Sequence, residues 1–272
     1  MSKHQGLGND FLVYDIRQGL PFTSGDPDTQ WASLARDWCD RRFGIGADGV
    51  LLLGREGTNE LTMVLYNADG SRAEISGNGI RCLVQAAYWQ DQIDGPATYV
   101  VNTDAGMRTV EVLEGSSSSN VAQLSVSMGV VSDIAEPANW AALQCNPDRP
   151  VRHLSLGNPH SVVSVEDVAD VDLQTLGALV PHVNLEIVAP GPEAHAITMR
   201  VHERGSGITL ACGSGACASA VAAKAWGFVP ASAPEVLVHM DGGDARVRID
   251  ATTSQATLIG PSVFIANVVF HV

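Results

Sequence analysis

The chain has 272 residues, of which 45% are hydrophobic and 17% charged, and its formal net charge is −14. This length can bury a substantial core and suits two domains. The acidic balance argues against nucleic acids or anionic membranes as partners, and no apolar run approaches the length of a membrane-spanning helix. The N-terminus lacks the apolar core of a secretory signal. The five cysteines do not have the regular spacing of a disulfide framework, which indicates free thiols. We therefore expect a cytoplasmic enzyme.

Short apolar runs between turn residues predict that strands dominate the chain. The expected strands cover residues 11–14, 49–53, 61–66, 122–128, 196–201, 235–240, 245–249, 256–259 and 263–272. Helical periodicity is confined to residues 30–41, 79–90, 172–179 and 215–226, the last followed by Gly227 as a C-terminal stop. Many strands and few helices predict an α+β fold, each half of the chain being a curled sheet around a helix.

Residues 44–49 (Gly44-Ile45-Gly46-Ala47-Asp48-Gly49) match the glycine pattern of dinucleotide-binding proteins. That pattern binds a pyrophosphate only where a strand precedes it and a helix follows it. Here a helical pattern precedes the motif and the apolar run 50–53 follows it. The motif is therefore predicted to be a tight turn into a strand.

A short glycine-rich motif occurs twice, 136 residues apart, as Ser76-Gly77-Asn78-Gly79 and Cys212-Gly213-Ser214-Gly215. Each copy follows an acidic, turn-rich approach and leads into an apolar helical pattern. A spacing of half the chain suggests a duplicated unit, with two similar halves facing each other. Two such helix starts could address both faces of one small molecule, which suits the inversion of a stereocentre.

The second copy offers a base and an anion site together. A thiol at a helix start, as at Cys212, is favoured as thiolate by the macrodipole and by unpaired backbone N–H groups. The same N–H groups, unobstructed at Gly213 and Gly215, can bind a carboxylate. A structural cysteine beside an ordinary helix cap is the alternative, and the repeat favours the functional interpretation. Cys212 and Cys217 lie on one helix start without a CxxC or HxxxH pair, so no metal site is expected.

The two motifs and their approaches resemble the signatures of diaminopimelate epimerases. The first signature matches Asn67-Ala68-Asp69-Gly70-Ser71 leading to residues 76–82, and the second matches Glu203-Arg204-Gly205 followed by residues 211–216. Three further segments also sit where this family has them, namely residues 6–11, 157–160 and 183–184. Together the matches span nearly the whole chain.

The resemblance implies a cofactor-free isomerase that interconverts LL- and meso-diaminopimelate, on the route to lysine and peptidoglycan. It implies two pseudo-symmetric halves, each a β-barrel-like sheet around a central helix. The expected domains are residues 1–121, to which a C-terminal strand over 262–272 returns, and residues 122–261. A homodimer is expected as well.

The resemblance also assigns roles to residues by position. Ser76 and Cys212 would be the catalytic pair, and His160 and Glu203 would flank the reacting centre. Glu203 also belongs to the expected substrate-binding set. The reacting carboxylate would be bound by Gly77, Asn78, Gly213 and Ser214, and another substrate carboxylate by Arg204. The distal amino acid end would be held by Asn9, Asn67, Asn158 and Asn184, since an amide offers both a donor and an acceptor.

Three positions depart from the family pattern. Gln5 replaces a histidine, Ile208 stands where glutamate is common, and Ser76 replaces the first of two catalytic cysteines. A thiol ionises near pH ~8.5, whereas an alcohol lies close to water at about 15.7. At ~1.36 kcal/mol per unit, the gap is on the order of 10 kcal/mol against a resting alkoxide. Ser76 is therefore expected to donate a proton but not to act as a resting base, which leaves that role to Cys212.

Because Ser76 leaves the enzyme impaired or adapted, other functions stay open. They are a racemase or epimerase of another amino acid on the same fold, a dehydratase of a hydroxylated amino acid, and a non-catalytic amino acid binder. One base and one alcohol would suffice for the elimination.

Overall fold

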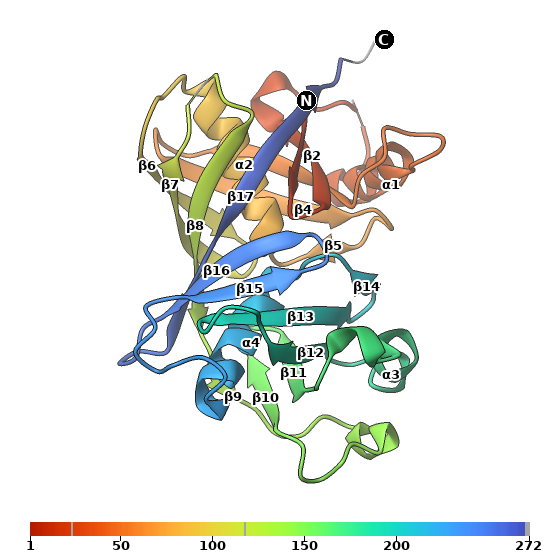
Figure 1. The fold of residues 1–272 in the computed structure, drawn as a ribbon. Coiled ribbons are helices and arrows are strands. Elements are labelled where there is room, and N and C mark those ends of the chain that lie inside the picture. The colour runs from red at the N-terminus through yellow and green to blue at the C-terminus, as the bar shows by residue number, and fades with distance from the viewer. Residues whose placement is uncertain (23, 117, 270–272) are drawn as a thin grey trace. The chain divides into compact units, whose positions relative to one another are not determined.

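The computed structural model describes residues 1–22, 24–116 and 118–269, and its chain divides into two compact units (Figure 1). The N-terminal unit comprises Met1–Val126 and Pro261–Val272, and the C-terminal unit comprises Ser127–Gly260. The chain passes from one unit to the other within β8 (Val121–Val130) and again within β17 (Gln255–Asn267). Both units therefore share these two strands.

Eight strands of the N-terminal unit close into a barrel. In order around the barrel, the strands are β1 (Ser2–Gly6), β2 (Asn9–Asp15), β3 (Gly49–Arg55), β4 (Glu60–Asn67), β6 (Ala97–Thr103), β7 (Gly106–Glu114), β8 and β17. The pairing of β17 with β1 closes the barrel. The pairs β2–β3 and β4–β6 are parallel. The short β5 (Arg72–Ala73) adds to the edge of β4, and η1 (Ile16–Gln18) follows β2.

The helix α2 (Gly77–Gln90) is the central helix of the N-terminal unit. Every residue from Gly77 to Tyr88 is buried, and the helix contacts β1, β2, β3, β6 and β7. A helix that is buried on all sides belongs to the core of a barrel rather than to its surface. The amphipathic α1 (Pro27–Cys39) instead packs against β3 and β4 from outside, around Trp31 (Figure 1).

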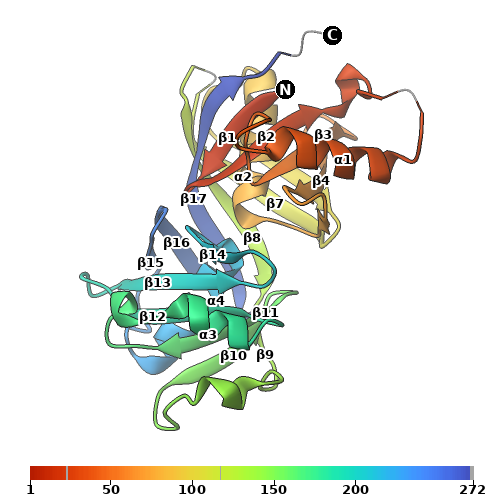
Figure 2. The ribbon, with the colours of Figure 1, turned by 90° about the vertical axis from the view of Figure 1, so that its right-hand side faces the viewer.

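The C-terminal unit repeats this order of elements (Figure 2). Its strands are β9 (Ser132–Asp133), β10 (Val151–Ser155), β11 (Pro159–Ser164), β12 (Asn184–Pro190), β13 (Ala196–Glu203), β14 (Gly207–Thr209), β15 (Val236–Met240), β16 (Gly243–Ile249) and the first half of β17. The alanine-rich α4 (Gly213–Trp226) is buried and contacts β10 to β13, β15 and β16. The shorter helices are α3 (Leu173–Leu179), η2 (Trp140–Leu143) and η3 (Val168–Asp170).

The predicted α+β fold of two pseudo-symmetric halves, each a barrel around a central helix, is confirmed. In both units two strands, a helix, three strands, the central helix and three strands follow one another, from β1 to β8 and from β10 to β17. The repeated motif is therefore part of a repeated unit. Residues 44–48 lie in the connection between α1 and β3, and Gly49 begins β3, so the motif leads from a turn into a strand, as predicted.

The tail and the helix limits differ from the prediction. One strand, β17, replaces the two expected over 256–259 and 263–272, since Gly260 and Pro261 continue in extended form; residues 270–272 lie outside the described part. α1 begins earlier because Asp26 caps it by accepting a hydrogen bond from the Thr29 N–H. α2 and α4 begin two residues early for the same reason, their caps being Ser76 and Cys212. Among the described residues, no helix is long and apolar enough to span a membrane.

Candidate active site

Ser76 and Cys212 occupy the same local position, the N-cap of the central helix of their unit. Ser76 has φ −130° and ψ 125°, and its Oγ accepts a hydrogen bond from the Gly79 N–H at 3.0 Å. Cys212 has φ −126° and ψ 114°, and its Sγ accepts from the Gly215 N–H at 3.4 Å. In both motifs the first helical residue is a glycine, so backbone N–H groups at the helix start are free of side-chain bulk. Such a start binds anions readily.

In the N-terminal unit, the structure joins Asn9 to the start of α2. The Asn78 Nδ2 donates to Asn9 Oδ1 at 3.3 Å, and Asn9 Nδ2 donates to Asp48 Oδ2 at 2.7 Å. Asp48 comes from the glycine-rich turn at residues 44–49 and accepts a further hydrogen bond from Arg41 at 2.7 Å. The turn therefore orients an expected substrate-binding amide. By contrast, Asn67 Nδ2 donates to Ser71 Oγ within its own turn, at 3.0 Å.

A fully buried arginine holds the helix start of the N-terminal unit from within. Arg81 donates from Nη1 to the Gly77 carbonyl and from Nη2 to Asn78 Oδ1, both at 2.9 Å, and from Nε to the Pro261 carbonyl at 3.2 Å. These bonds fix the backbone at Gly77 and the side chain of Asn78. Both residues belong to the set expected to bind the reacting carboxylate.

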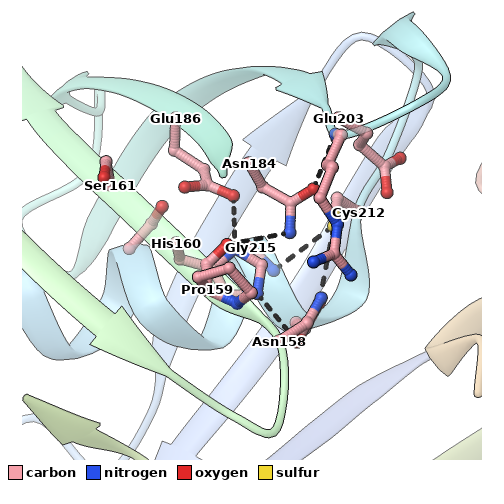
Figure 3. A network of polar contacts seen from close by, with 12 residues as sticks. Asn158, Pro159, His160, Ser161, Asn184, Glu186, Glu203, Cys212 and Gly215 are labelled. Carbon is pink, nitrogen blue, oxygen red and sulfur yellow. Dashed lines mark hydrogen bonds and ion pairs between the residues drawn. The ribbon is translucent and has the colours of Figure 1, made fainter. Parts of the chain in front are cut away.

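In the C-terminal unit, polar contacts connect several of the expected residues (Figure 3). His160 Nε2 lies 3.1 Å from Asn158 Oδ1, and Asn158 Nδ2 donates to Ser214 Oγ at 3.2 Å. Ser214 Oγ lies 3.6 Å from Cys212 Sγ. Asn158, in the turn between β10 and β11, thus links His160 on β11 to the start of α4.

Asn184 connects the other expected residues of this unit. Its Nδ2 donates to the Pro159 carbonyl at 3.2 Å, and its Oδ1 accepts from the Arg204 N–H at 2.9 Å. It therefore ties the start of β11 to Arg204, which directly follows Glu203, the last residue of β13. Glu203 Oε1 accepts a hydrogen bond from the Thr209 hydroxyl. In the contacts given above, the Asn158 and Asn184 side chains each use one N–H and one oxygen lone pair, which leaves a second N–H and a second lone pair for a ligand.

The expectation that Cys212 rests as a thiolate is wrong. Burial raises the pKa of the Cys212 thiol well above its usual range, and the Glu203 and Glu186 carboxylates raise it further. The hydrogen bonds from the Gly215 N–H and with Ser214 lower the pKa, but by less. Desolvation of a side chain that is 5% exposed thus outweighs the donors at the helix start. The surroundings of Cys212 therefore favour the thiol over the thiolate.

Sequence reasoning missed Glu186, which is fully buried on β12. Its Oε1 lies 2.6 Å from His160 Nδ1 (Figure 3). A signal was available, because this carboxylate interrupts the apolar run Leu185-Glu186-Ile187-Val188-Ala189. A charged residue is rarely buried without a partner or a function.

Two of the three departures from the family pattern have structural roles here. Gln5 Oε1 accepts a hydrogen bond from the Gly8 N–H at 2.9 Å and so holds the turn between β1 and β2. Ile208, on β14, packs against a core cluster that includes Leu173 and Leu185. Neither side chain is titratable, unlike the histidine and the glutamate that the family has at these positions.

Alanine in place of Gly215 is expected to lower activity strongly. A Cβ there would lie 2.6 Å from Glu186 Oε1 and 3.3 Å from Cys212 Sγ, so one or both must shift. A displacement of about 1 Å in a catalytic group can cost on the order of 10²-fold in rate. Steady-state kinetics with diaminopimelate, the substrate that the sequence resemblance implies, measure the effect, and thermal unfolding confirms that the variant is folded. Unchanged kcat/KM would show that the thiol tolerates the crowding.

Comparisons with known proteins agree with this arrangement. The family model "Diaminopimelate epimerase" matches residues 1–132 and 153–265. Diaminopimelate epimerases of Thermosynechococcus vestitus and Cyanothece sp. are 37% and 35% identical to the chain, and each alignment covers 96% of the chain and 95% of the relative. A crystal structure of a hydroxyproline epimerase from Agrobacterium vitis has the same fold, with a TM-score of 0.63 at 15% identity over 97% of the chain and 88% of that protein. The chain belongs to the diaminopimelate epimerase family, a family of isomerases.

Proposed function

We propose that the protein interconverts LL- and meso-diaminopimelate by cofactor-independent proton transfer at the α-carbon. Family membership supports the substrate and the reaction class. The observation that carries the proposal is the matched pair of helix N-caps, Ser76 and Cys212, with nearly identical backbone angles and an N–H donor from a glycine three residues on. A stereocentre is inverted when one such group removes a proton and the other delivers one to the opposite face.

The substrate carboxylate next to the reacting carbon would bind the helix starts at Gly77 and Asn78 and at Gly213 and Ser214. Arg204 would contact a substrate carboxylate. Asn9, Asn67, Asn158 and Asn184 would hold the distal amino acid end, with His160 and Glu203 beside the reacting centre. The hydrogen bonds that orient Asn9, Asn158 and Asn184 support this role, because a pre-oriented amide loses less entropy on binding.

The raised pKa of Cys212 requires that substrate binding promote its ionisation. Burial is the main cause that keeps the proton on the sulfur, and the negative charges of Glu203 and Glu186 add to it. An α-ammonium bound beside these carboxylates brings a positive charge, which favours the thiolate. Cys212 would then remove the α-proton while the Ser76 hydroxyl donates one from the other face.

Two features of the proposal concern the protein in the cell. A cytoplasmic location fits free thiols and a biosynthetic role. A homodimer is proposed from the family resemblance, and sedimentation equilibrium tests it.

Lysine is expected to be a very poor substrate. It lacks the second carboxylate, so polar groups that hold the distal end of diaminopimelate would be left without partners. Sites of this kind discriminate by factors of roughly 10⁴. Competition of lysine and of an apolar amino acid with LL-diaminopimelate, measured as kcat/KM, checks the expectation. Comparable rates on either would favour a general amino acid racemase instead.

The proposed function itself is tested by incubating the purified protein with LL-diaminopimelate alone. Chiral chromatography should show meso-diaminopimelate accumulating toward equilibrium, and meso-diaminopimelate as the starting isomer should give the LL form. Cys212→Ala protein serves as the matched control. If neither isomer is converted while another amino acid is racemised, the substrate assignment is wrong.

A further inference from the structure

The proposed roles leave Asp48, in the glycine-rich turn at residues 44–49, without a function. Backbone hydrogen bonds already hold this turn in place: the Asp48 N–H donates to the Asp10 carbonyl at 2.8 Å, and the Asp48 carbonyl accepts from the Ala68 N–H at 2.9 Å. The Asp48 side chain is 40% exposed and forms an ion pair with Arg41. An ion pair that faces solvent contributes little to stability. The fold therefore gives little reason for a carboxylate at this position.

A series of polar side chains leads from Asp48 to the start of α2, within the N-terminal unit. Asp48 Oδ2 accepts from Asn9 Nδ2 at 2.7 Å, and Asn9 Oδ1 accepts from Asn78 Nδ2 at 3.3 Å. Asn78 Oδ1 in turn accepts from Arg81 Nη2 at 2.9 Å. A carboxylate thus stands at one end of the series and a guanidinium at the other. The two amides between them both belong to the proposed substrate site.

The guanidinium fixes which way round both amides lie. Arg81 is fully buried and can only donate, so Asn78 must turn its oxygen toward Arg81 and its Nδ2 toward Asn9. Asn9 must then meet Asn78 with its oxygen, which leaves its Nδ2 for Asp48. Turning either amide over would set two donors or two acceptors against each other. The group at the far end must therefore be an acceptor.

Asp48 supplies that acceptor in a fixed place. Its Oδ2 also accepts from the Asp10 backbone N–H at 3.0 Å, and its Oδ1 accepts from Arg41 Nη2 at 2.7 Å. These two groups can only donate, so they hold both oxygens as acceptors. The carboxylate is thereby kept in place to receive the Asn9 Nδ2.

We propose that Asp48 is a positioning residue for Asn9: it holds the Nδ2 end of the amide, so that Asn9 meets the substrate in one orientation. In the contacts above Asn9 uses one N–H and one lone pair, which leaves a second of each for a ligand. Without Asp48, the amide would keep the longer of its two contacts, that with Asn78. Substrate would then have to order the amide on binding, which costs affinity. The inference rests on the proposed function in taking Asn9 as part of the substrate site.

The first measurement uses no substrate, so its outcome does not depend on the proposed function. Exchange of side-chain NH2 protons with water and 15N relaxation are followed by NMR, and the Asn9 signals are those missing from Asn9→Ala protein. Asp48→Ala should speed exchange of the bonded Asn9 proton by at least about fivefold, the effect of one hydrogen bond, and should make the NH2 group more mobile. Unchanged exchange and mobility would overturn the proposal.

Asp48→Asn separates the loss of the acceptor from the loss of the charge. One amide oxygen can replace Oδ2 beside the Asp10 N–H, while Arg41 turns to the Asp10 carboxylate, which it already binds at 2.6 Å. The Asn9 signals should then be close to those of wild type. Equal effects of alanine and asparagine would mean that Asp48 acts by its charge, and would overturn the proposal.

Asp40→Ala is the matched control, because it removes another carboxylate from the connection between α1 and β3. Asp40 accepts hydrogen bonds from the Arg42 and Phe43 N–H groups, and its loss should leave the Asn9 signals unchanged. Thermal unfolding checks that each variant is folded. Asp48→Leu, which keeps the shape of the side chain without its acceptors, replaces the alanine variant if that protein is not folded.

The second measurement extends the test to the substrate. Asp48→Ala should raise KM for diaminopimelate by about fivefold with kcat nearly unchanged, because an amide that holds the distal end contributes to binding rather than to chemistry. In the Asn9→Ala background the same replacement should have no further effect on KM. An equal rise in both backgrounds would show that Asp48 does not act through Asn9 and would overturn the proposal. If the wild-type protein converted no diaminopimelate, the proposed function would fail, and the NMR comparison would still decide for or against Asp48.

Discussion

Cys212→Ala protein is expected to lose both isotope exchange at the α-carbon and isomer interconversion. The thiol caps α4 beside the glycine N–H groups proposed to bind the carboxylate, and alanine offers no acid or base in its place. General acid–base groups contribute roughly 10² to 10⁴ in rate. The measurement is loss of the α-proton signal of diaminopimelate in deuterated water, followed by NMR with both starting isomers.

Cys217→Ala is the matched control for this loss, since Cys217 lies on the same helix and is fully buried. Its replacement should keep exchange near the wild-type rate and lower the free energy of unfolding by about 1 kcal/mol, a typical cost for a small core truncation. If Cys212→Ala protein kept more than about a tenth of the wild-type exchange rate, Cys212 would not be the base.

Ser76→Cys protein is expected to epimerise at least about tenfold faster than wild type. Such a gain requires the barrier to fall by only a small part of the ~10 kcal/mol that separates an alkoxide from a thiolate. After Ser76 donates its proton, it must remain as an alkoxide or be reprotonated in the same step. The reverse reaction must begin from that state, so microscopic reversibility slows both directions. The structure accommodates the thiol, because Cys212 caps α4 with nearly the same backbone angles as Ser76 caps α2. Initial rates of meso-diaminopimelate formation check the gain.

Ser125→Cys provides a matched control, since it adds a thiol to the same unit on the strand β8 rather than at the N-cap of α2. No gain in rate is expected there. An unchanged or lower rate for Ser76→Cys would mean that Ser76 is not an impaired counterpart of Cys212. The chain would then be better described as a serine-adapted enzyme, with a different substrate to be sought.

Much of this architecture could be predicted because the repeat is local in sequence. The serine or cysteine before Gly77 and Gly213 is a helix-cap signal, and the apolar helix that follows each is recognisable alone. The continuity of β17 was not predictable in this way, since glycine and proline at 260 and 261 read as a break. Pairing with β1, β8 and β16 keeps this segment extended as one strand. Such pairing depends on tertiary structure rather than on the local sequence.

The electrostatics of the site could not be read from the sequence for a similar reason. A helix start favours a thiolate in water, whereas Cys212 lies buried beside two carboxylates that are 9 and 26 residues away in the chain. Desolvation and like charges depend on that packing, and they reverse the local expectation. Glu186 escaped notice because its partner, His160, stands on the neighbouring strand β11, in parallel register with β12.

The most direct test of the epimerase assignment is to incubate the wild-type protein with each isomer of diaminopimelate in deuterated water and to follow deuterium and configuration together. The account predicts that the opposite isomer appears with deuterium at the inverted carbon. It also predicts that the isomer whose α-hydrogen faces Cys212 gains deuterium faster than its opposite forms, because Ser76 limits the second proton transfer. An elimination product without inversion, or the absence of both exchange and inversion with either isomer, would contradict it.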